Sequence, residues 1–264
     1  MPVIIDGTNG VNTPNTFAFK NRIIDGGFTI NQRGYVSGTS LSSGSYGHDR
    51  WKGGASGGTY TFTQGSTGVN TTITITAGSI IQVIEGANLP EGGTYVLSWT
   101  GTAQGKIGSG SFGASGITGT ITAGTNTNIE FNTGTCGNVQ LEVGSTATSF
   151  DYRPYGTELA LCQRYFQSYT QPPLRGVVNA TNGAGRMAMI LPVVMRTSPT
   201  AVVGAMNVYD GGTSSGAISS VDASFLDPFQ VEFDFGLSVN TYVVGRAATV
   251  YQNGSASMTL SAEL

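Results

Sequence analysis

Charged residues are scarce in this chain. Asp, Glu, Lys and Arg make up 10% of its 264 residues, against about a quarter of an ordinary soluble domain. This scarcity argues against a helix-rich enzyme covered with ion pairs. The 12 Lys and Arg residues are outnumbered by 15 Asp and Glu, and the isoelectric point is about 5.1. The chain therefore lacks the basic character that binds phosphate backbones or anionic lipids, and we expect no nucleic-acid partner.

Cysteine and histidine are almost missing too. Cys136 and Cys162 are the only cysteines, and neither has another Cys or a His near it in the sequence. This spacing fits no metal or redox motif, so we predict free, buried thiols, no metal site and no cofactor. His48 is the single histidine, and no Gly-x-Ser-x-Gly turn accompanies it. We interpret His48 as a loop residue and predict no catalytic residues.

Long hydrophobic runs are absent as well. No segment approaches the roughly 18 apolar residues of a membrane-spanning helix, and the first 25 residues lack the charged and apolar parts of a secretion leader. We therefore expect a soluble protein without membrane insertion that is not exported by the standard route. Disorder is disfavoured because hydrophobic residues still make up 39% of the chain, with 12 Phe and 11 Tyr.

Glycine, threonine and serine dominate instead. The chain has 40 Gly, 34 Thr and 25 Ser, many of them clustered between short segments of alternating character. In Thr72–Thr76, Ile129–Asn132 and Val139–Val143, apolar residues occupy every second position. That period places one face of a strand in a core and the other in water. We predict an all-β fold of two antiparallel, jelly-roll-like β-sandwich domains behind a short N-terminal segment.

One short helical pattern marks the domain boundary. It covers Thr157–Cys162, where Thr157 can cap a helix and Glu158 favours its positive end. Just before it, Pro154 and Gly156 interrupt the strand pattern. We therefore predict an N-terminal segment at 1–18, a first sandwich at 19–153 and a second sandwich at 154–264.

Several blocks of the sequence resemble one known family. They are Asn21–Phe28, Gln32–Gly34, Asp49–Trp51, Val139–Tyr155 and Glu158–Phe166. Together they are similar to the signature blocks of bacteriophage tail fibre proteins and related virion surface proteins, over roughly residues 19–264. The head of the chain, Ile5–Val11, also resembles short segments that open phage tail proteins.

The resemblance implies a jelly-roll domain similar to carbohydrate-binding modules, followed by a second β domain. It further implies a non-enzymatic virion protein, made in the bacterial cytoplasm and carried on the tail fibre, that contacts host surface polysaccharide. A capsid decoration or head fibre protein is the alternative, and the sequence leaves both open. The residues implied in attachment to other phage structural proteins are Ile5, Asp6, Gly7, Asn9, Gly10 and Val11.

Aromatic residues near turns are candidates for sugar binding. An aromatic ring packs on the C–H face of a sugar, while amides and charged groups bind its hydroxyls. We name Tyr35, Tyr46, Trp51 and Tyr209 as candidate carbohydrate-binding residues. Tyr35 and Tyr46 are expected in exposed loops and Tyr209 beside a turn, whereas core packing is the stronger interpretation of Trp51.

A polysaccharide depolymerase is a second alternative function. Such an enzyme needs two carboxylates about 5 to 10 Å apart, and Glu232 and Asp234 share one face of an expected strand. Val231, Phe233 and Phe235 take the opposite face, which would leave both carboxylates on the solvent side. We therefore interpret the pair as a solvated strand face.

Two apolar stretches indicate association between copies. Met187–Met195 and Thr241–Ala248 are uncharged over most of their length, and one small sandwich would not cover them fully. We therefore expect a homotrimer. Residues 1–18 contain too few apolar side chains to form a core, so we expect them to be ordered against a partner.

Overall fold

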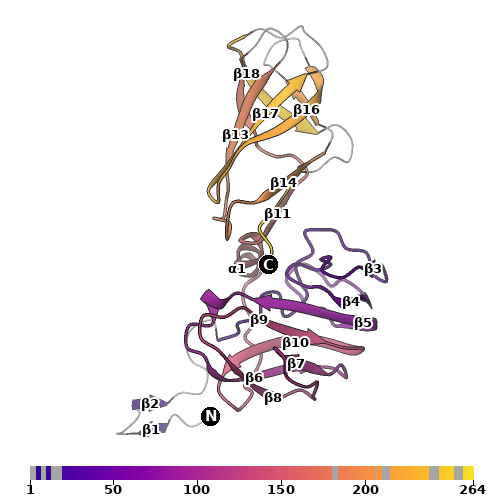
Figure 1. Ribbon diagram of the computed structural model, residues 1–264, viewed down its shortest axis with the longest axis vertical. Coiled ribbons are helices and arrows are strands. Elements are labelled where there is room, and N and C mark those ends of the chain that lie inside the picture. The colour runs from indigo at the N-terminus through magenta and orange to yellow at the C-terminus, as the bar shows by residue number, and fades with distance from the viewer. Residues whose placement is uncertain are drawn as a thin grey trace. The chain divides into compact units, whose positions relative to one another are not determined.

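The computed structural model describes residues 4–6, 10–12, 20–179, 184–204, 206–209, 215–237, 244–252 and 258–264. Antiparallel strands are the main regular structure of this part, and the described α-helix, α1, spans Tyr155–Gln163 (Figure 1). The predicted all-β fold is confirmed. Two compact units are present, Met1–Leu159 with Leu264 and Ala160–Glu263. No helix in the described ranges is long and apolar enough to cross a membrane.

The N-terminal unit is a β-sandwich. Strand neighbours follow the order β3-β4-β5-β9-β7 on one side and β10-β6-β8 on the other, with β10 joined to β5. The elements are β3 (Ser40–Leu41), β4 (Lys52–Thr61), β5 (Ile73–Ile84), the 3-10 helix η1 (Gly86–Asn88), β6 (Gly93–Thr100), β7 (Gly105–Ile107), β8 (Ile117–Ile121), β9 (Thr127–Phe131) and β10 (Gly134–Val143).

Strand β10 belongs to both parts of this sandwich. Its first residues, Gly134–Cys136, pair with Ile73–Ile75 of β5, and Gln140–Val143 pair with Tyr95–Ser98 of β6. The register shifts between the two segments, where Asn138 takes a positive φ of 49°. An irregularity of this kind bends a strand and increases its twist. One continuous strand thereby passes from one side of the core to the other.

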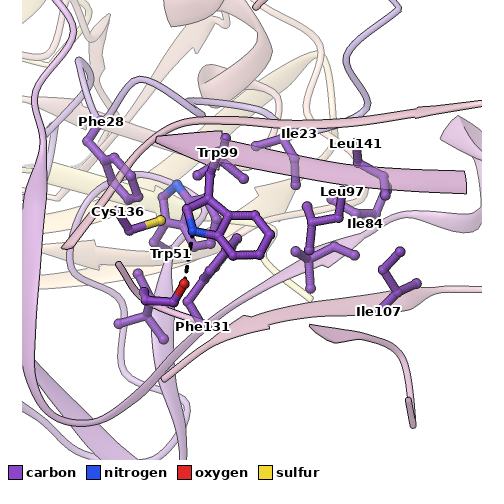
Figure 2. Packing of buried hydrophobic residues seen from close by; sticks show 14 of the residues in the cluster. Ile23, Phe28, Trp51, Ile84, Leu97, Trp99, Ile107, Phe131, Cys136 and Leu141 are labelled. Atoms are coloured by element: carbon purple, nitrogen blue, oxygen red, sulfur yellow. Dashed lines mark hydrogen bonds between the residues drawn. The ribbon is translucent and has the colours of Figure 1, made fainter. Parts of the chain in front are cut away.

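Alternating apolar residues fill the core of the sandwich (Figure 2). Trp99 is 6% exposed, and its ring meets the Phe131 ring edge-on with centroids 5.0 Å apart. The Trp99 indole nitrogen donates to the carbonyl oxygen of Ala103 at 3.0 Å, so its polar atom is satisfied inside the core. Cys136 lies in the same core, Cys162 is also buried, and neither forms a disulfide bond. The prediction of two buried cysteines outside any disulfide is confirmed.

The C-terminal unit contains a closed barrel. In the described ranges its strands follow the order β12-β13-β17-β16-β15-β18, with β18 paired back onto β12. These strands are β12 (Arg175–Val178), β13 (Gly185–Ile190), β15 (Met206–Tyr209), β16 (Ser215–Leu226), β17 (Gln230–Leu237) and β18 (Ala247–Gln252). A separate three-stranded sheet has the order β11 (Phe166–Tyr169), β19 (Met258–Ser261) and β14 (Thr200–Val203). Closure of the larger sheet leaves the barrel without a free strand edge.

Barrel closure changes the interpretation of the stretch Met187–Met195. Met187, Met189 and Met195 lie in the barrel core and are at most 5% exposed. With Leu191, four of the nine residues are buried because a closed sheet encloses its inner face, but Val194 is 45% exposed, so the stretch is covered only in part. Ile190, which is 82% exposed, points outward. Residues 241–243 of the second stretch lie outside the described residues, and its Ala248 is buried.

The N-terminal segment contains two short strands. β1 (Ile4–Asp6) pairs antiparallel with β2 (Gly10–Asn12), so that Ile5 stands opposite Val11 and Asp6 opposite Gly10. No other strand of the described ranges joins this two-stranded sheet. Gly7 and Asn9, which we also expected to take part in attachment, lie outside the described residues.

Polar side chains fasten the two ends of the sandwich to each other. Arg153 donates from Nη1 to the carbonyl oxygen of Ile23 at 3.0 Å and from Nη2 to that of Asn21. Glu158 accepts from Arg153 Nη1 at 3.1 Å and from the backbone N–H of Asp25 at 2.5 Å. The Arg153 side chain is only 4% exposed. The segment that begins the sandwich and the segment that leaves it are thus held side by side by buried, charge-assisted hydrogen bonds.

Replacing Arg153 by Ala should destabilise the sandwich strongly. The change leaves Glu158 and two backbone carbonyl oxygens without their buried donor, which costs about 2–4 kcal/mol. Arg22→Ala is the matched control, because the Arg22–Glu91 pair at 2.6 Å has side chains 24% and 47% exposed and contributes at most about 1 kcal/mol. Urea unfolding of both variants tests this, and equal losses of stability would contradict it.

Candidate functional site

Trp51 is part of the core and is withdrawn as a sugar-binding candidate. It is 0% exposed, and its indole nitrogen donates to the carbonyl oxygen of Asp25 at 3.0 Å. Its ring lies 5.0 Å from the ring of Phe28, between centroids. No face of the indole ring is open to a sugar. The burial of Trp51 supports its interpretation as a core residue.

The neighbouring residues of the signature blocks are also internal. Asp25 Oδ1 accepts from the backbone N–H groups of Thr29 at 2.7 Å and Ile30 at 3.1 Å. Burial raises the pKa of Asp25 well above its usual value, and the nearby Asp49 carboxylate raises it further. Asp49 itself is 1% exposed and accepts from the backbone of Gln32 at 3.0 Å. Asp25 and Asp49 therefore belong, like Trp51, to the interior of the sandwich.

Tyr35 is half-buried in an aromatic cluster. Its ring centroid lies 4.7 Å from that of Tyr60 and 6.0 Å from that of Phe62, and its hydroxyl donates to the carbonyl oxygen of Thr39. We expected an exposed loop ring. The packing corrects this, because Tyr35 is half-buried against two other rings, and ring pairs in such geometry contribute to stability.

His48 lies beneath this cluster and is 0% exposed. Its Nδ1 is 2.9 Å from the Tyr60 hydroxyl and its Nε2 is 3.1 Å from Gln64 Oε1. Burial lowers the pKa of His48 to about 4, so the ring is neutral at physiological pH. Burial also raises the pKa of Tyr60. A neutral, enclosed imidazole held by a phenol and an amide is a packing element of the core.

Tyr46 lies between two cations. The Arg33 guanidinium carbon is 4.8 Å and the Lys52 ammonium nitrogen 5.7 Å from the centre of its ring. Both contacts are in the range of cation–π interactions. Tyr46 is partly exposed, but its ring is already engaged. None of the three candidates of the sandwich therefore presents an unobstructed aromatic face.

The outer face of the barrel carries an exposed ion pair. Arg186 of β13 and Asp234 of β17 stand opposite each other in the strand register. Arg186 Nε and Nη2 donate to the two carboxylate oxygens of Asp234 at 2.7 and 3.1 Å, and Arg186 Nη1 lies 3.9 Å from Glu232. Val231, Phe233 and Phe235 are buried on the inner face, at most 4% exposed, so both carboxylates take the solvent side as predicted.

A hollow of about 380 Å³ opens beside this ion pair. It is lined by Asn179, Ala184, Gly185, Arg186, Asp234, Phe235 and Gly236. The register places these residues where β12 ends, β13 begins and β17 ends, so they share one end of the barrel. Two of the lining residues, Gly185 and Gly236, are glycines and contribute backbone alone. This is the size at which small-molecule sites begin, about 300 Å³.

Tyr209 stands on the outside of the barrel on β15, which lies three strands away from β13 in either direction around the barrel. It is 40% exposed, and the preceding Val208 is 0% exposed in the barrel core. The register sets Tyr209 beside Thr249 of β18, and Thr249 beside Arg175 of β12. Arg175 Nη1 donates to the Thr249 hydroxyl at 2.6 Å. Arg175 therefore lies on the strand next to Arg186, whereas Tyr209 belongs to another part of the barrel wall than the ion pair.

Two residues of this surface were missed at the sequence level. Asn179 and Arg186 were not among the candidates, because each is an isolated polar residue beside an apolar segment. The alternation of Met187 and Met189 with Arg186, Ala188 and Ile190 marks Arg186 as outward-facing. It does not reveal Asp234 as its partner, because pairing of β13 with β17 joins residues far apart in the sequence.

Comparison with known proteins gives no relative. No family model matches this chain, and neither a curated protein nor a solved structure matches it. A functional proposal for the chain rests on its own residues and on the sequence resemblance.

Replacing His48 by Gln isolates the effect of its lowered pKa. The folded-state value of about 4 lies below the ordinary value of 6.5, so unfolding takes up a proton between these pH values. The stability that neutral His48 contributes is complete above pH 6.5 and is lost as the pH falls toward 4, by on the order of 3 kcal/mol. We expect urea unfolding to show that the difference in free energy of unfolding between wild type and H48Q decreases by this amount as the pH falls from 6.5 toward 4.

Asp25 does not disturb this comparison. Its raised pKa makes stability increase as the pH falls, which is the opposite sign, and it acts in wild type and H48Q alike. A stability difference between the two proteins that does not change with pH would show that His48 is not held neutral.

Proposed function

We propose that this protein is a non-enzymatic virion protein of the phage tail fibre type that contacts polysaccharide on the host surface. The observation that carries the proposal is the outer face of the barrel. There, the polar side chains of Asn179, Arg186 and Asp234 line a hollow of ligand size. The resemblance of the signature blocks supplies the virion context. In this proposal the barrel contacts the host and the sandwich is a structural support.

The geometry at Asp234 favours binding over polysaccharide cleavage. A glycosidase needs one carboxyl group that stays protonated to act as general acid, which requires a raised pKa. The hydrogen bonds from Arg186 hold the pKa of Asp234 below its usual value. Asp234 is therefore an unsuitable acid, and Arg186 Nη1 also lies 3.9 Å from Glu232. A depolymerase activity is accordingly the weaker proposal.

The N-terminal segment is proposed to attach the protein to the particle. The pairing of β1 with β2 provides a small sheet, and a two-stranded sheet of this size is marginal unless another surface completes it. A further strand from another phage structural protein, or from another copy, would do so. We retain the homotrimer as part of this proposal. Its support is the exposed outer residues of the barrel, such as Ile190, and no longer the buried methionines.

Purified protein should compete with the phage for host cells. If it is a receptor-binding protein, cells preincubated with it will adsorb particles more slowly, because the receptor glycans are already occupied. Heat-unfolded protein is the control for unspecific effects of added polypeptide. Unchanged adsorption, together with immunogold labelling of the capsid, would contradict the proposal and identify a capsid decoration protein.

Removing residues 1–18 should separate attachment to the particle from binding to the host. The truncated protein keeps both folded units and should still compete for host cells, but particles assembled with it should lack it. Full-length protein supplied in the same way is the control for expression. Truncated protein present at wild-type occupancy on purified particles would place the attachment surface on one of the folded units.

A further inference from the structure

We propose that the hollow beside Arg186 and Asp234 is a binding site for a neutral sugar residue. This inference deepens the proposed function, on which it rests, because it names the ligand class and the residues that hold it. The site consists of the Arg186–Asp234 pair, Asn179 and the open backbone at Gly185 and Gly236.

The ion pair is arranged to receive hydroxyl groups. Its two parallel hydrogen bonds use the Nε donor and one Nη2 donor of Arg186. A guanidinium has five N–H donors, so three remain, and the carboxylate oxygens of Asp234 keep further lone pairs. A pair of neighbouring sugar hydroxyls can accept from the guanidinium and donate to the carboxylate at the same time. The mutual orientation of the two groups is already fixed, so a ligand loses little side-chain freedom on binding.

The rest of the hollow suits the same ligand. Asn179 is exposed, and its amide both donates and accepts. At Gly185 an added Cβ would come within 2.3 Å of the Phe235 ring and 2.6 Å of the carbonyl oxygen of Val177. No side chain can therefore fill the hollow from this position without a shift of its neighbours. The volume of about 380 Å³ lies at the lower end of the range for small-molecule sites.

The local charges select a neutral ligand. Arg186 faces two carboxylates, Asp234 directly and Glu232 at 3.9 Å, so an anionic group would meet more negative than positive charge. An apolar partner would remove an exposed ion pair from water without replacing its hydrogen bonds. A hydroxylated, uncharged ring avoids both penalties. We therefore assign the hollow to neutral sugars and not to acidic polysaccharides.

Titration of the intact protein with defined sugars tests the site. The probes are neutral trisaccharides of glucose, mannose, galactose and N-acetylglucosamine, with trigalacturonic acid as the acidic probe, and the readout is the amide NMR spectrum. We expect at least one neutral probe to shift the resonances of residues 184–186 and 234–236. Arg186→Ala should weaken that binding by at least about tenfold, because hydrogen bonds to a charged group are lost.

Arg175→Ala is the matched control. Arg175 is an exposed arginine of the same barrel face but does not line the hollow, so its replacement should leave the affinity unchanged. Arg186→Ala should also keep the melting temperature of wild type within a few degrees, because exposed ion pairs stabilise little. Absence of binding by every neutral probe, tighter binding of trigalacturonic acid, or equal affinity of R186A and wild type would overturn the assignment.

The cell competition assay separates this inference from the proposed function. If wild type and R186A both slow phage adsorption equally, the protein contacts the host through another surface and only the hollow is wrongly assigned. If neither slows adsorption, the proposed function itself fails. Competition by wild type and loss of it in R186A supports both.

Discussion

The rest of this structure depends on one constraint, which is that every second side chain along the paired strands is buried in a core. With only 10% charged residues, the chain has few ion pairs, and its two units are held by apolar faces enclosed within antiparallel sheets. Backbone pairing and burial of this kind depend little on ionic strength, unlike exposed ion pairs. The few charges that are buried therefore have specific positions, and Arg153 and Glu158, which hold the segment that leaves the sandwich against the segment that begins it, are the clearest case.

The same constraint separates structural from functional residues. Residues of the signature blocks, including Asp25, Asp49 and Trp51, are enclosed in the sandwich, where their polar atoms satisfy backbone groups. The exposed polar residues of the barrel stand at the alternate positions of strands whose other side chains form a core. Arg186 follows from this rule, because its neighbour Met187 is buried. A binding surface of this kind is carried by rigid strands and needs no special backbone geometry.

The sequence was informative where the physics is local. Alternation predicted the antiparallel strands and the outward direction of Glu232 and Asp234, since each depends on positions within one strand. It did not predict barrel closure, because a strand in a barrel has the same period as one in a sandwich. It also misjudged Tyr35, whose Gly- and Ser-rich surroundings indicate a loop but do not reveal that Tyr60 and Phe62 pack against it. Barrel closure and the packing of Tyr35 both depend on contacts between residues far apart in the sequence.

Electron cryo-tomography of phage particles attached to host cells tests the central claim most directly. The account predicts that this protein lies where the particle touches the cell, with antibody label against the C-terminal barrel at the cell surface and label against the N-terminal segment toward the particle. Label confined to the capsid, away from every contact with the cell, would contradict a host-binding role.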